Sequence, residues 1–426
     1  MLSCPCGHLF GSKHAIFQHQ RDKALGGNDS ACKGLLIEDQ RPPAKGRYED
    51  WLWRSVNRYK MVKKINSTLK PQTTSVSSTS ACEFLCSYNW VNCKELTITI
   101  PGFAPIWNNK SSVDLPKDEG VDQNSFPNPR YQFLPLFQSL ASMKPHHRLD
   151  DVDVVVTRNS LRKLLDFCSG RVSESFRVNL FLVGKTLFID RYERNPRWLI
   201  SGSRDPGYGR SFEKAFTEYP SGLEHSIGHH RVMQYSLGEL NCMVQFEVDA
   251  CYPGDQANDL ADLNIDLDLL TPLMDRLSIS ELVEENATKI TVEETDRQPM
   301  SQSMAAELKL RNKRHSNGAD MPQLWFGRTP WLIVGYHTKG TVNKVNTINA
   351  ATRFANWETE NQTELCKLAT VLSRLREGVM KNKGMNCSAI CQKHSSPPLL
   401  KIYSSESQIP VLPAGFMERF WASKNT

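Results

Sequence analysis

The sequence lacks any apolar run long enough to cross a membrane. Its longest such runs, at residues 331–335 and 179–184, fall far short of the ~20 residues that a transmembrane helix needs. The amino terminus, Met1-Leu-Ser-Cys-Pro-Cys6, has no apolar signal region either. Both absences argue against the membrane and secreted classes. We therefore expect a nuclear or cytoplasmic protein with no membrane partner.

Other patterns are missing as well. There is no internal repeat, and Cys387 and Cys391 have no second cysteine pair with which to form a metal site. Prenyl-diphosphate chemistry would need two separated Asp-Asp-x-x-Asp motifs, but Asp150-Asp151-Val-Asp153 has the wrong spacing and no counterpart. We therefore exclude that chemistry. Most of the 12 cysteines lie in apolar segments, where packing in the core is the expected role.

The charge is unevenly distributed along the 426 residues. Residues 1–70 hold 13 basic and 6 acidic residues, a net charge of +7, whereas residues 255–297 hold 12 acidic and 3 basic residues, a net charge of −9. With a total of +6, the remainder carries +8. The basic regions favour a polyanionic partner, and an ordinary solvated surface is an equal alternative.

The first 35 residues resemble a C2H2-type zinc finger. Twelve residues separate Cys6 from His19, and Phe10 and Ile16 fall between them, where a small ββα finger needs its core residues. We predict a Zn²⁺ site in which the metal largely replaces a core. The predicted ligands are Cys4, Cys6, His19 and Cys32. His14 is the alternative to Cys32, and a frayed basic terminus is the alternative to the finger.

Composition divides the rest of the chain. Residues 36–82 contain Pro42-Pro43, an amphipathic piece around Trp51 and a stretch rich in Ser, Thr, Lys and Gln. This pattern predicts a basic linker with a helix in it. We expect a folded domain over residues 83–400, interrupted by the acidic insert 255–297, and a C-terminal tail over 401–426. The insert is expected to be a loop with one short helix at 273–285.

Apolar periodicity predicts the elements of this domain. Strands are expected over residues 96–100, 153–157, 179–183, 185–190, 241–249 and 331–335. Helices are expected over residues 160–168, 211–218 and 352–376. Mixed strands and helices over about 300 residues predict an α+β fold, in which helices flank a twisted mixed β-sheet.

Acidic residues on these elements suggest a metal site. Glu247 and Asp249 lie two apart in one predicted strand, and Glu307 and Lys309 lie two apart in another, so each pair shares a face. Glu213 lies early in a predicted helix. Carboxylates within apolar strands need a compensating partner, and hard oxygen ligands select Mg²⁺ or Mn²⁺. A Glu-x-Asp strand followed by a Glu-x-Lys strand is typical of metal-dependent nucleases. Two surface strands with exposed charges are the alternative.

The same motifs resemble the decapping exoribonuclease (DXO-type) family over roughly residues 88–345. The shared motifs, in chain order, are Thr157-Arg158-Asn-Ser-Leu-Arg-Lys-Leu-Leu165, Gly207-Tyr208 with Phe212-Glu213, Phe246-Glu247-Val248-Asp249, Ala306-Glu307-Leu308-Lys309 and Leu324-Trp325-Phe-Gly-Arg-Thr-Pro330-Trp-Leu-Ile-Val-Gly335. The resemblance implies a nuclease-like fold and removal of defective or noncanonical 5′ caps from RNA, with exoribonuclease activity. It also implies a 5′–3′ exonuclease as a possible protein partner.

Carried over residue by residue, the resemblance implies a role for each motif. Metal ligands would be Glu213, Glu247, Asp249, Glu307 and the backbone carbonyl of Leu308. Lys309 would lie by the scissile phosphate, Arg158 would grip an RNA phosphate, and Arg328 would add a contact to nucleic acid. Lys309, Arg158, Glu247 and Asp249 would thus be the catalytic residues.

The sequence departs from the family pattern at three places that bear on activity. Two residues are inserted before Glu213, and a long acidic insert separates Asp249 from Glu307. Gly327 stands where family members carry a glutamine, for which Gln323 is a possible substitute. The alternative function is therefore a catalytically degenerate nucleic-acid-binding or scaffold protein on a nuclease fold. His229-His230 is expected in a loop or around the site, and Trp325 and Trp331 in the core or at its rim.

Overall fold

The computed structural model describes residues 49–118, 129–193, 207–254, 289–312 and 317–421, together with two short strands near the amino terminus. The chain divides into two units, Met1–Arg54 and Ser55–Thr426. In the first unit, β1 (Leu2–Ser3) pairs antiparallel with β2 (Leu9–Phe10), and a 3-10 helix, η1, covers Asp50–Trp53. Cys4, Cys6, His19 and Cys32 lie outside the described residues, so the zinc finger stays a prediction.

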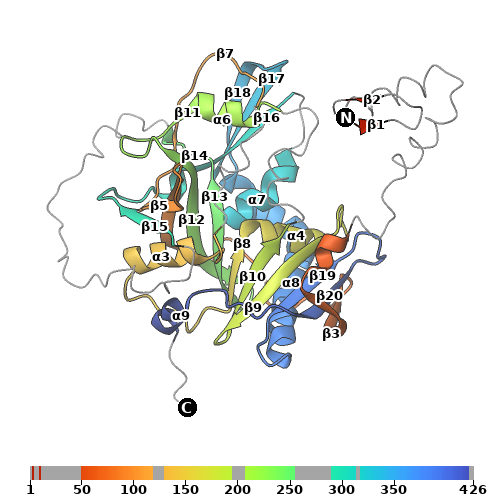
Figure 1. Ribbon diagram of the computed structural model, residues 1–426. Coiled ribbons are helices and arrows are strands. Elements are labelled where there is room, and N and C mark those ends of the chain that lie inside the picture. Colours follow the sequence, from red (N-terminus) through yellow and green to blue (C-terminus); the bar gives the residue numbers. More distant parts are fainter. Residues whose placement is uncertain are drawn as a thin grey trace, which may run out of the picture. The chain divides into compact units, whose positions relative to one another are not determined.

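The second unit is built on two mixed β-sheets (Figure 1). Within the described residues the larger sheet has 11 strands, ordered from edge to edge as β15 (Thr291–Glu294), β5 (Thr97–Ile100), β4 (Cys82–Val91), β12 (Ser226–Leu237), β13 (Leu240–Val248), β8 (Val154–Thr157), β10 (Thr186–Tyr192), β9 (Phe176–Val183), β19 (Cys387–Cys391), β20 (Leu399–Ser405) and β3 (Val56–Asn66). Strand β8 runs parallel to both of its neighbours, β13 and β10, whereas most other pairs are antiparallel.

The smaller sheet has seven strands in the described part of the chain. Their order is β11 (Thr217–Glu218), β6 (Ile106–Trp107), β14 (Ala250–Cys251), β16 (Ala305–Arg311), β17 (Trp331–Thr338), β18 (Thr341–Asn349) and β7 (Val113–Asp114). Strands β16 and β17 are parallel, with Glu307 opposite Leu332. Strand β14 follows β13 directly in the chain, so the polypeptide passes from the larger sheet to the smaller one at the single residue between them, Asp249.

Helices cover both faces of the larger sheet. Their bounds are α3 (Leu134–Met143), α4 (Arg158–Cys168), α6 (Gly209–Phe216), α7 (Met321–Gly327), α8 (Phe354–Lys381) and α9 (Ala414–Phe420), with short 3-10 helices η4 (Gln302–Met304), η5 (Asn317–Asp320) and η6 (Ala351–Arg353). In β8, Val154 and Val156 join the core beneath α4 and α8, whereas Val155 between them joins the core beneath α3 and α9. This alternation explains why a fully apolar strand is buried on both faces.

Helix α6 packs on the smaller sheet. Its Phe212 and Phe216 are fully buried in a separate core cluster, and the ring of Phe216 stacks on Trp107 of β6 with the centroids 5.4 Å apart. The side chain of Asp118 accepts hydrogen bonds from the backbone N–H groups of Arg210 and Ser211, which fixes the first turn of the helix.

None of the helices in the described residues is long and apolar enough to span a bilayer.

The predicted α+β fold with a mixed sheet is confirmed, as are the six strands and three helices expected from periodicity, to within a few residues at their ends. The linker and helix expected over residues 36–82 were wrong for Val56–Asn66, which is the edge strand β3 paired with β20. The backbone of β3 pairs with β20, which lies more than 300 residues later in the sequence. The exposed lysines of β3 do not alternate with apolar residues, so local periodicity did not indicate a strand there.

Two further expectations differ from the structure. In the acidic insert, Thr291–Glu294 is not a loop but strand β15, because it pairs in parallel with β5. The helix expected at 273–285 lies outside the described residues. The C-terminal tail contains the end of β20 and the whole of α9, whose Phe416 and Phe420 are fully buried against α3 and the sheet. The domain limits themselves stay predictions.

Candidate active site

The site lies where the chain passes from the larger sheet to the smaller one. Glu247 is near the end of β13, and Asp249 is the residue that joins β13 to β14. Asp249 Oδ2 accepts a hydrogen bond of 2.9 Å from the backbone N–H of Leu308 in β16. A charge-assisted bond of this kind holds the carboxylate beside the strand that carries Glu307.

Glu307 is only 2% exposed and is surrounded by hydrogen-bond donors. Lys309 Nζ lies 2.5 Å from Glu307 Oε1, and Arg158 Nη1 lies 3.3 Å from Glu307 Oε2. Gln323 Nε2 donates a further hydrogen bond to Oε1. Because an unpaired buried carboxylate is costly, these three partners account for the burial. Glu307 and Lys309, which were predicted to share one face of the strand, are therefore in direct contact.

Arg158 reaches Glu307 from the first turn of α4. The helix begins there because Thr157, at the end of β8, accepts a hydrogen bond from the backbone N–H of Ser160 through its hydroxyl group. The guanidinium group of Arg158 also lies 5.5 Å from the centre of the Phe246 ring in β13. Its Nε atom has no hydrogen-bond partner among the described residues. One donor of this buried cation is therefore left for a ligand.

Gln323 supplies the side-chain amide that Gly327 lacks. A Cβ atom at Gly327 would lie 2.7 Å from Thr329 Oγ1 and 3.2 Å from Arg158 Nη1, so no side chain fits there without movement of its neighbours. Gln323 is one turn earlier on the same face of α7. Its amide nitrogen donates to Glu307, and its amide oxygen accepts a 2.9 Å hydrogen bond from Arg162 Nη1. The suggested reach of Gln323 into the site is thus confirmed as a contact.

The cations beside Glu307 set the pKa values of this side of the site. Burial alone would raise the pKa of Glu307, but Lys309 and Arg158 outweigh it and lower that pKa below its ordinary value. Burial likewise opposes the charged form of Lys309, yet Glu307 and Asp249 raise its pKa. Glu307 is therefore ionised and Lys309 protonated at neutral pH.

Glu213 and Asp249 behave in the opposite way. Glu213 is solvent-accessible, but the protein around its carboxyl group and the nearby Glu247 carboxylate raise its pKa to about 7, with Lys309 opposing. Burial, followed by Glu307 and Glu213, raises the pKa of Asp249 well above its ordinary value. Glu213 is thus electrostatically coupled to the strand carboxylates despite the two residues inserted before it. Lys309 only partly offsets these carboxylates, since the pKa values of Glu213 and Asp249 stay raised.

The donor chemistry of these carboxylates fits a hard divalent cation. Their oxygens are the ligands that Mg²⁺ and Mn²⁺ prefer, and a bound cation would offset both the burial and the repulsion that raise the pKa values of Glu213 and Asp249. Within the described ranges, no group of three or more His, Cys, Asp or Glu side chains is already spaced to hold a metal ion. Leu308 contributes its N–H to Asp249. The metal role of its carbonyl stays a prediction.

Two further residues lie near the carboxylates: His230, which was expected in a loop or around the site, and Tyr219, which the sequence analysis missed. His230 lies directly opposite Glu247 in the β12–β13 pair, and its ring stacks on Tyr88 with the centroids 5.0 Å apart. Burial lowers the pKa of His230, Arg158 lowers it further, and Glu247 opposes them. Burial and then the Glu247, Glu213 and Asp249 carboxylates raise the pKa of Tyr219. The β12–β13 hairpin register would have revealed His230, whereas no local signal marks Tyr219.

Arg328 lies apart from these groups. Its guanidinium carbon is 4.0 Å from the centre of the Trp325 ring and 4.2 Å from that of Tyr235, and its Nη1 donates to the Trp325 carbonyl. Arg328 is 8% exposed and takes the left-handed conformation (φ 48°) at the end of α7. These contacts place it in the core beside Trp325, and its contact with nucleic acid stays a prediction.

Comparisons with known proteins agree with this architecture. A family model described as "Domain of unknown function (DUF8563)" matches residues 59–421. No curated protein matches the sequence.

Among solved structures, the chain is similar to Scheffersomyces stipitis Rai1 in complex with (3′-NADP)+ and calcium ion, at 12% identity and a TM-score of 0.52, over 80% of this chain and 92% of that one. It is also similar to Candida albicans Rai1 in complex with pU5-Mn²⁺, at 12% identity and a TM-score of 0.51, over 83% and 99%. Both are structures of the Rai1/Dxo1 decapping exonuclease family, so the likeness shows the fold.

Proposed function

Because this chain belongs to the family described as Domain of unknown function DUF8563, whose description names no activity, we propose its function from the site itself. The proposed function is a divalent-metal-dependent hydrolase that cleaves phosphate linkages at the 5′ end of RNA. The observation that carries the proposal is the buried Glu307 carboxylate in contact with Lys309 and Arg158, together with the electrostatic coupling of Glu213 and Asp249 to the neighbouring carboxylates where the two sheets join. The fold neighbours described with pU5-Mn²⁺ and with (3′-NADP)+ and calcium add to its support.

In this proposal the carboxylates of Glu213, Glu247, Asp249 and Glu307 hold Mg²⁺ or Mn²⁺. The metal would polarise a phosphate and favour deprotonation of a water molecule when it is bound. Asp249 is kept in place by the Leu308 amide, and Glu307 by its three donors. Two of the four carboxylates are thus fixed before any ligand arrives, which lowers the cost of organising the site.

The two cations take different roles because their surroundings differ. Lys309 is 31% exposed and remains protonated, so its ammonium group can neutralise charge that develops on a phosphate. Arg158 is 6% exposed and is anchored to Glu307, with Nε still without a partner in the described part of the chain. A buried guanidinium with a free donor suits one fixed contact to an RNA phosphate.

Gly327 and the two residues inserted before Glu213 favoured a degenerate, non-catalytic protein, but the contacts around Glu307 and Glu213 weaken that argument. Gln323 supplies the amide that Gly327 lacks, and Glu213 is coupled to Glu247 despite the inserted residues. We therefore favour the enzyme. Removal of defective or noncanonical caps, a pyrophosphohydrolase step and a 5′–3′ exonuclease partner remain finer predictions within it.

The test is to incubate the purified full chain with 5′-triphosphate, capped and 5′-monophosphate RNAs in the presence of Mn²⁺ or Mg²⁺. We expect metal-dependent release of the 5′ group from at least one RNA, and no release with a chelator. The double variant Glu247→Ala/Asp249→Ala should lose the activity by about 10³-fold or more, because it removes two ligands of the metal.

A matched control is Glu360→Ala, which removes an exposed carboxylate from α8. It should cleave RNA at the wild-type rate. If a folded wild-type protein releases nothing from any of the three RNAs, the enzyme proposal is wrong. Equal activity of the wild-type chain and the Glu247→Ala/Asp249→Ala variant would also contradict it.

A further inference from the structure

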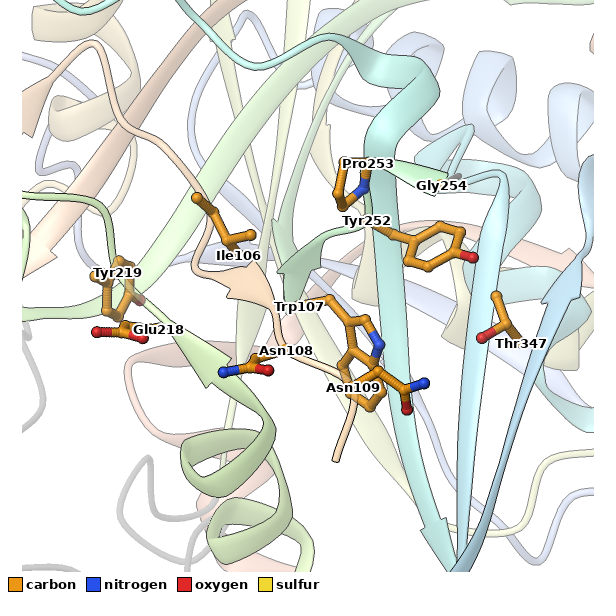
Figure 2. Close-up of a pocket in the computed structure, with 10 residues that line it drawn as sticks. All are labelled: Ile106, Trp107, Asn108, Asn109, Glu218, Tyr219, Tyr252, Pro253, Gly254 and Thr347. Atoms are coloured by element: carbon orange, nitrogen blue, oxygen red, sulfur yellow. The ribbon is translucent and has the colours of Figure 1, made fainter. Parts of the chain in front are cut away.

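A pocket of about 500 Å³ opens on the smaller sheet (Figure 2). It is formed where β6, β11 and β14 of the smaller sheet meet, and its volume falls within the range of small-molecule sites. Tyr219 follows β11, the strand after the helix of Glu213, and Tyr252 follows β14, the strand after Asp249. The pocket is therefore built partly by the strands that directly follow the helix of Glu213 and the residue Asp249.

Three aromatic rings line this pocket. In Figure 2, Trp107 lies between Tyr219 on one side and Tyr252 on the other. The Trp107 ring is held from behind by Phe216, and the Tyr252 ring makes an edge contact with Trp331 at 4.9 Å between centroids. Rings that are already fixed lose little conformational freedom when a flat ligand packs on them.

The pocket also presents polar groups that the protein leaves unused. The side-chain amides of Asn108 and Asn109, the hydroxyl groups of Tyr219 and Tyr252, and the Glu218 carboxylate make no hydrogen bonds within the described part of the chain. The two asparagines and Glu218 are exposed, and the backbone of Asn108 is fixed by a 2.7 Å bond to the Phe216 carbonyl. Donors and acceptors are thus both available on a rigid frame.

The charges of the lining residues indicate which part of a nucleotide-like ligand the pocket could bind. No lysine or arginine is among the lining residues, and Glu218 is the ionisable acid there. A phosphate group would meet no cation and one carboxylate. An uncharged, flat ring with hydrogen-bonding edges would find stacking surfaces and both kinds of polar partner. The chain links the pocket to the carboxylates, because Tyr219 follows α6 and β11 only six residues after Glu213, and Tyr252 is three residues after Asp249.

We propose that this pocket binds a nucleobase next to the phosphates being cleaved, with stacking on Trp107, Tyr219 and Tyr252 and edge contacts to Asn108, Asn109 and Glu218. The inference rests on the proposed function for its substrate, but its binding step needs no metal and no cleavage. The base has two sources, the cap nucleoside and the first nucleoside of the RNA, which share the same chemistry.

The first experiment is calorimetric titration of the full chain, with a chelator present, using guanosine or adenosine 5′-monophosphate and, in parallel, ribose 5-phosphate. We expect the nucleotide to bind and the base-free sugar phosphate to bind at least tenfold more weakly. Tyr252→Leu should weaken nucleotide binding by about five- to a hundredfold, the range for loss of one stacked base. Asn109→Ala, an exposed change, should weaken it by about three- to tenfold.

Tyr59→Leu is the matched control, because Tyr59 is a fully exposed tyrosine on the edge strand β3. It should bind the nucleotide like the wild-type chain. The proposal is overturned if ribose 5-phosphate binds as tightly as the nucleotide. It is also overturned if both Tyr252→Leu and Asn109→Ala bind like the wild type.

Failure of the proposed function would look different. In the presence of a chelator the wild-type chain should bind the nucleotide whether or not it cleaves RNA when metal is added, so nucleotide binding without any cleavage contradicts the proposed function and leaves the pocket proposal standing. For the source of the base, the binding of capped RNA with an abasic first nucleotide is compared with that of uncapped RNA with a normal one. If Tyr252→Leu weakens the binding of only the capped RNA with the abasic nucleotide, the pocket holds the cap base. If it weakens the binding of only the uncapped RNA, the pocket holds the base of the first nucleotide. Loss with neither contradicts the proposal.

Discussion

Glu307 lies in β16, and Asp249 is hydrogen-bonded to the backbone of the next residue in that strand, Leu308. The surroundings of these two neighbouring carboxyl groups nevertheless shift their pKa values in opposite directions. On what we term the Glu307 side, Lys309, Arg158 and Gln323 surround one buried carboxylate and lower its pKa. On what we term the carboxylate side, which holds Glu213, Glu247 and Asp249, burial and the neighbouring carboxylates raise the pKa of Glu213 to about 7 and that of Asp249 well above its ordinary value. The difference indicates which side would take a divalent cation. Protein cations balance the charge of Glu307, whereas Lys309 only partly offsets the carboxylate side.

The largest expected effect on stability comes from a substitution of Glu307 itself. Glu307→Gln removes the charge that holds Arg158 and Lys309 and leaves a buried guanidinium without its anion. We expect a loss of about 3–5 kcal/mol in the free energy of unfolding at neutral pH, measured by urea denaturation.

The matched change on the carboxylate side is Glu247→Gln. With a chelator present it should not lower stability, because it removes repulsion and leaves no cation unpaired. Similar losses for Glu307→Gln and Glu247→Gln would mean that the two sides do not differ in charge balance.

A smaller effect concerns the amide donor of the Glu307 side. Gln323→Ala removes a hydrogen bond to a buried carboxylate, so we expect about 1.5–3 kcal/mol lower stability and at least tenfold slower cleavage. The informative second variant is Gln323→Ala/Gly327→Gln. It should not recover either property, since a Cβ atom at 327 would lie 2.7 Å from Thr329 Oγ1. Full recovery would show that the glutamine can be supplied from either position.

The smallest effect is the dependence of stability on pH in metal-free protein. The pKa values of Glu213 and Asp249 are raised in the folded state, so their contribution to stability is complete below their ordinary values of 4.5 and 3.8. For Glu213 it is lost as the pH rises through about 7. The lowered pKa of Glu307 has the opposite sign, because its contribution is present above 4.5 and is lost on acidification.

Urea midpoints measured with a chelator between about pH 5 and pH 8 test these signs. The wild-type midpoint should fall toward pH 8, and Glu213→Gln should flatten that fall. Saturating Mn²⁺ should remove it in the wild type, because deprotonated carboxylates bind the ion. A wild-type midpoint that rises over this range would contradict the assignment of uncompensated charge.

Much of the fold followed from local pattern. Strand β8 is a short apolar run and α4 a strongly amphipathic helix, so periodicity placed both within a few residues. The spacing of Glu307 and Lys309 predicted their shared face for the same reason. These features depend on residues that are neighbours in the chain.

What escaped prediction depends on partners far away in the sequence. Strand β3 has four lysine or arginine residues and no apolar alternation, and it is a strand because β20 supplies its backbone partners. His230 meets Glu247 only through the β12–β13 register, and Arg328 is buried only because Trp325 and Tyr235 stack on it. Tertiary contacts override local preference at each of these positions.

A calorimetric titration of Mn²⁺ into the full chain tests the central claim most directly. We predict binding at one or two sites in the wild-type chain, with protons released at pH 7, no measurable binding in Glu247→Ala/Asp249→Ala, and wild-type binding in Glu360→Ala. If the wild-type chain and the double variant give the same titration, or if the folded wild-type chain binds no Mn²⁺, the carboxylate side is not a metal site and the proposed hydrolase is wrong.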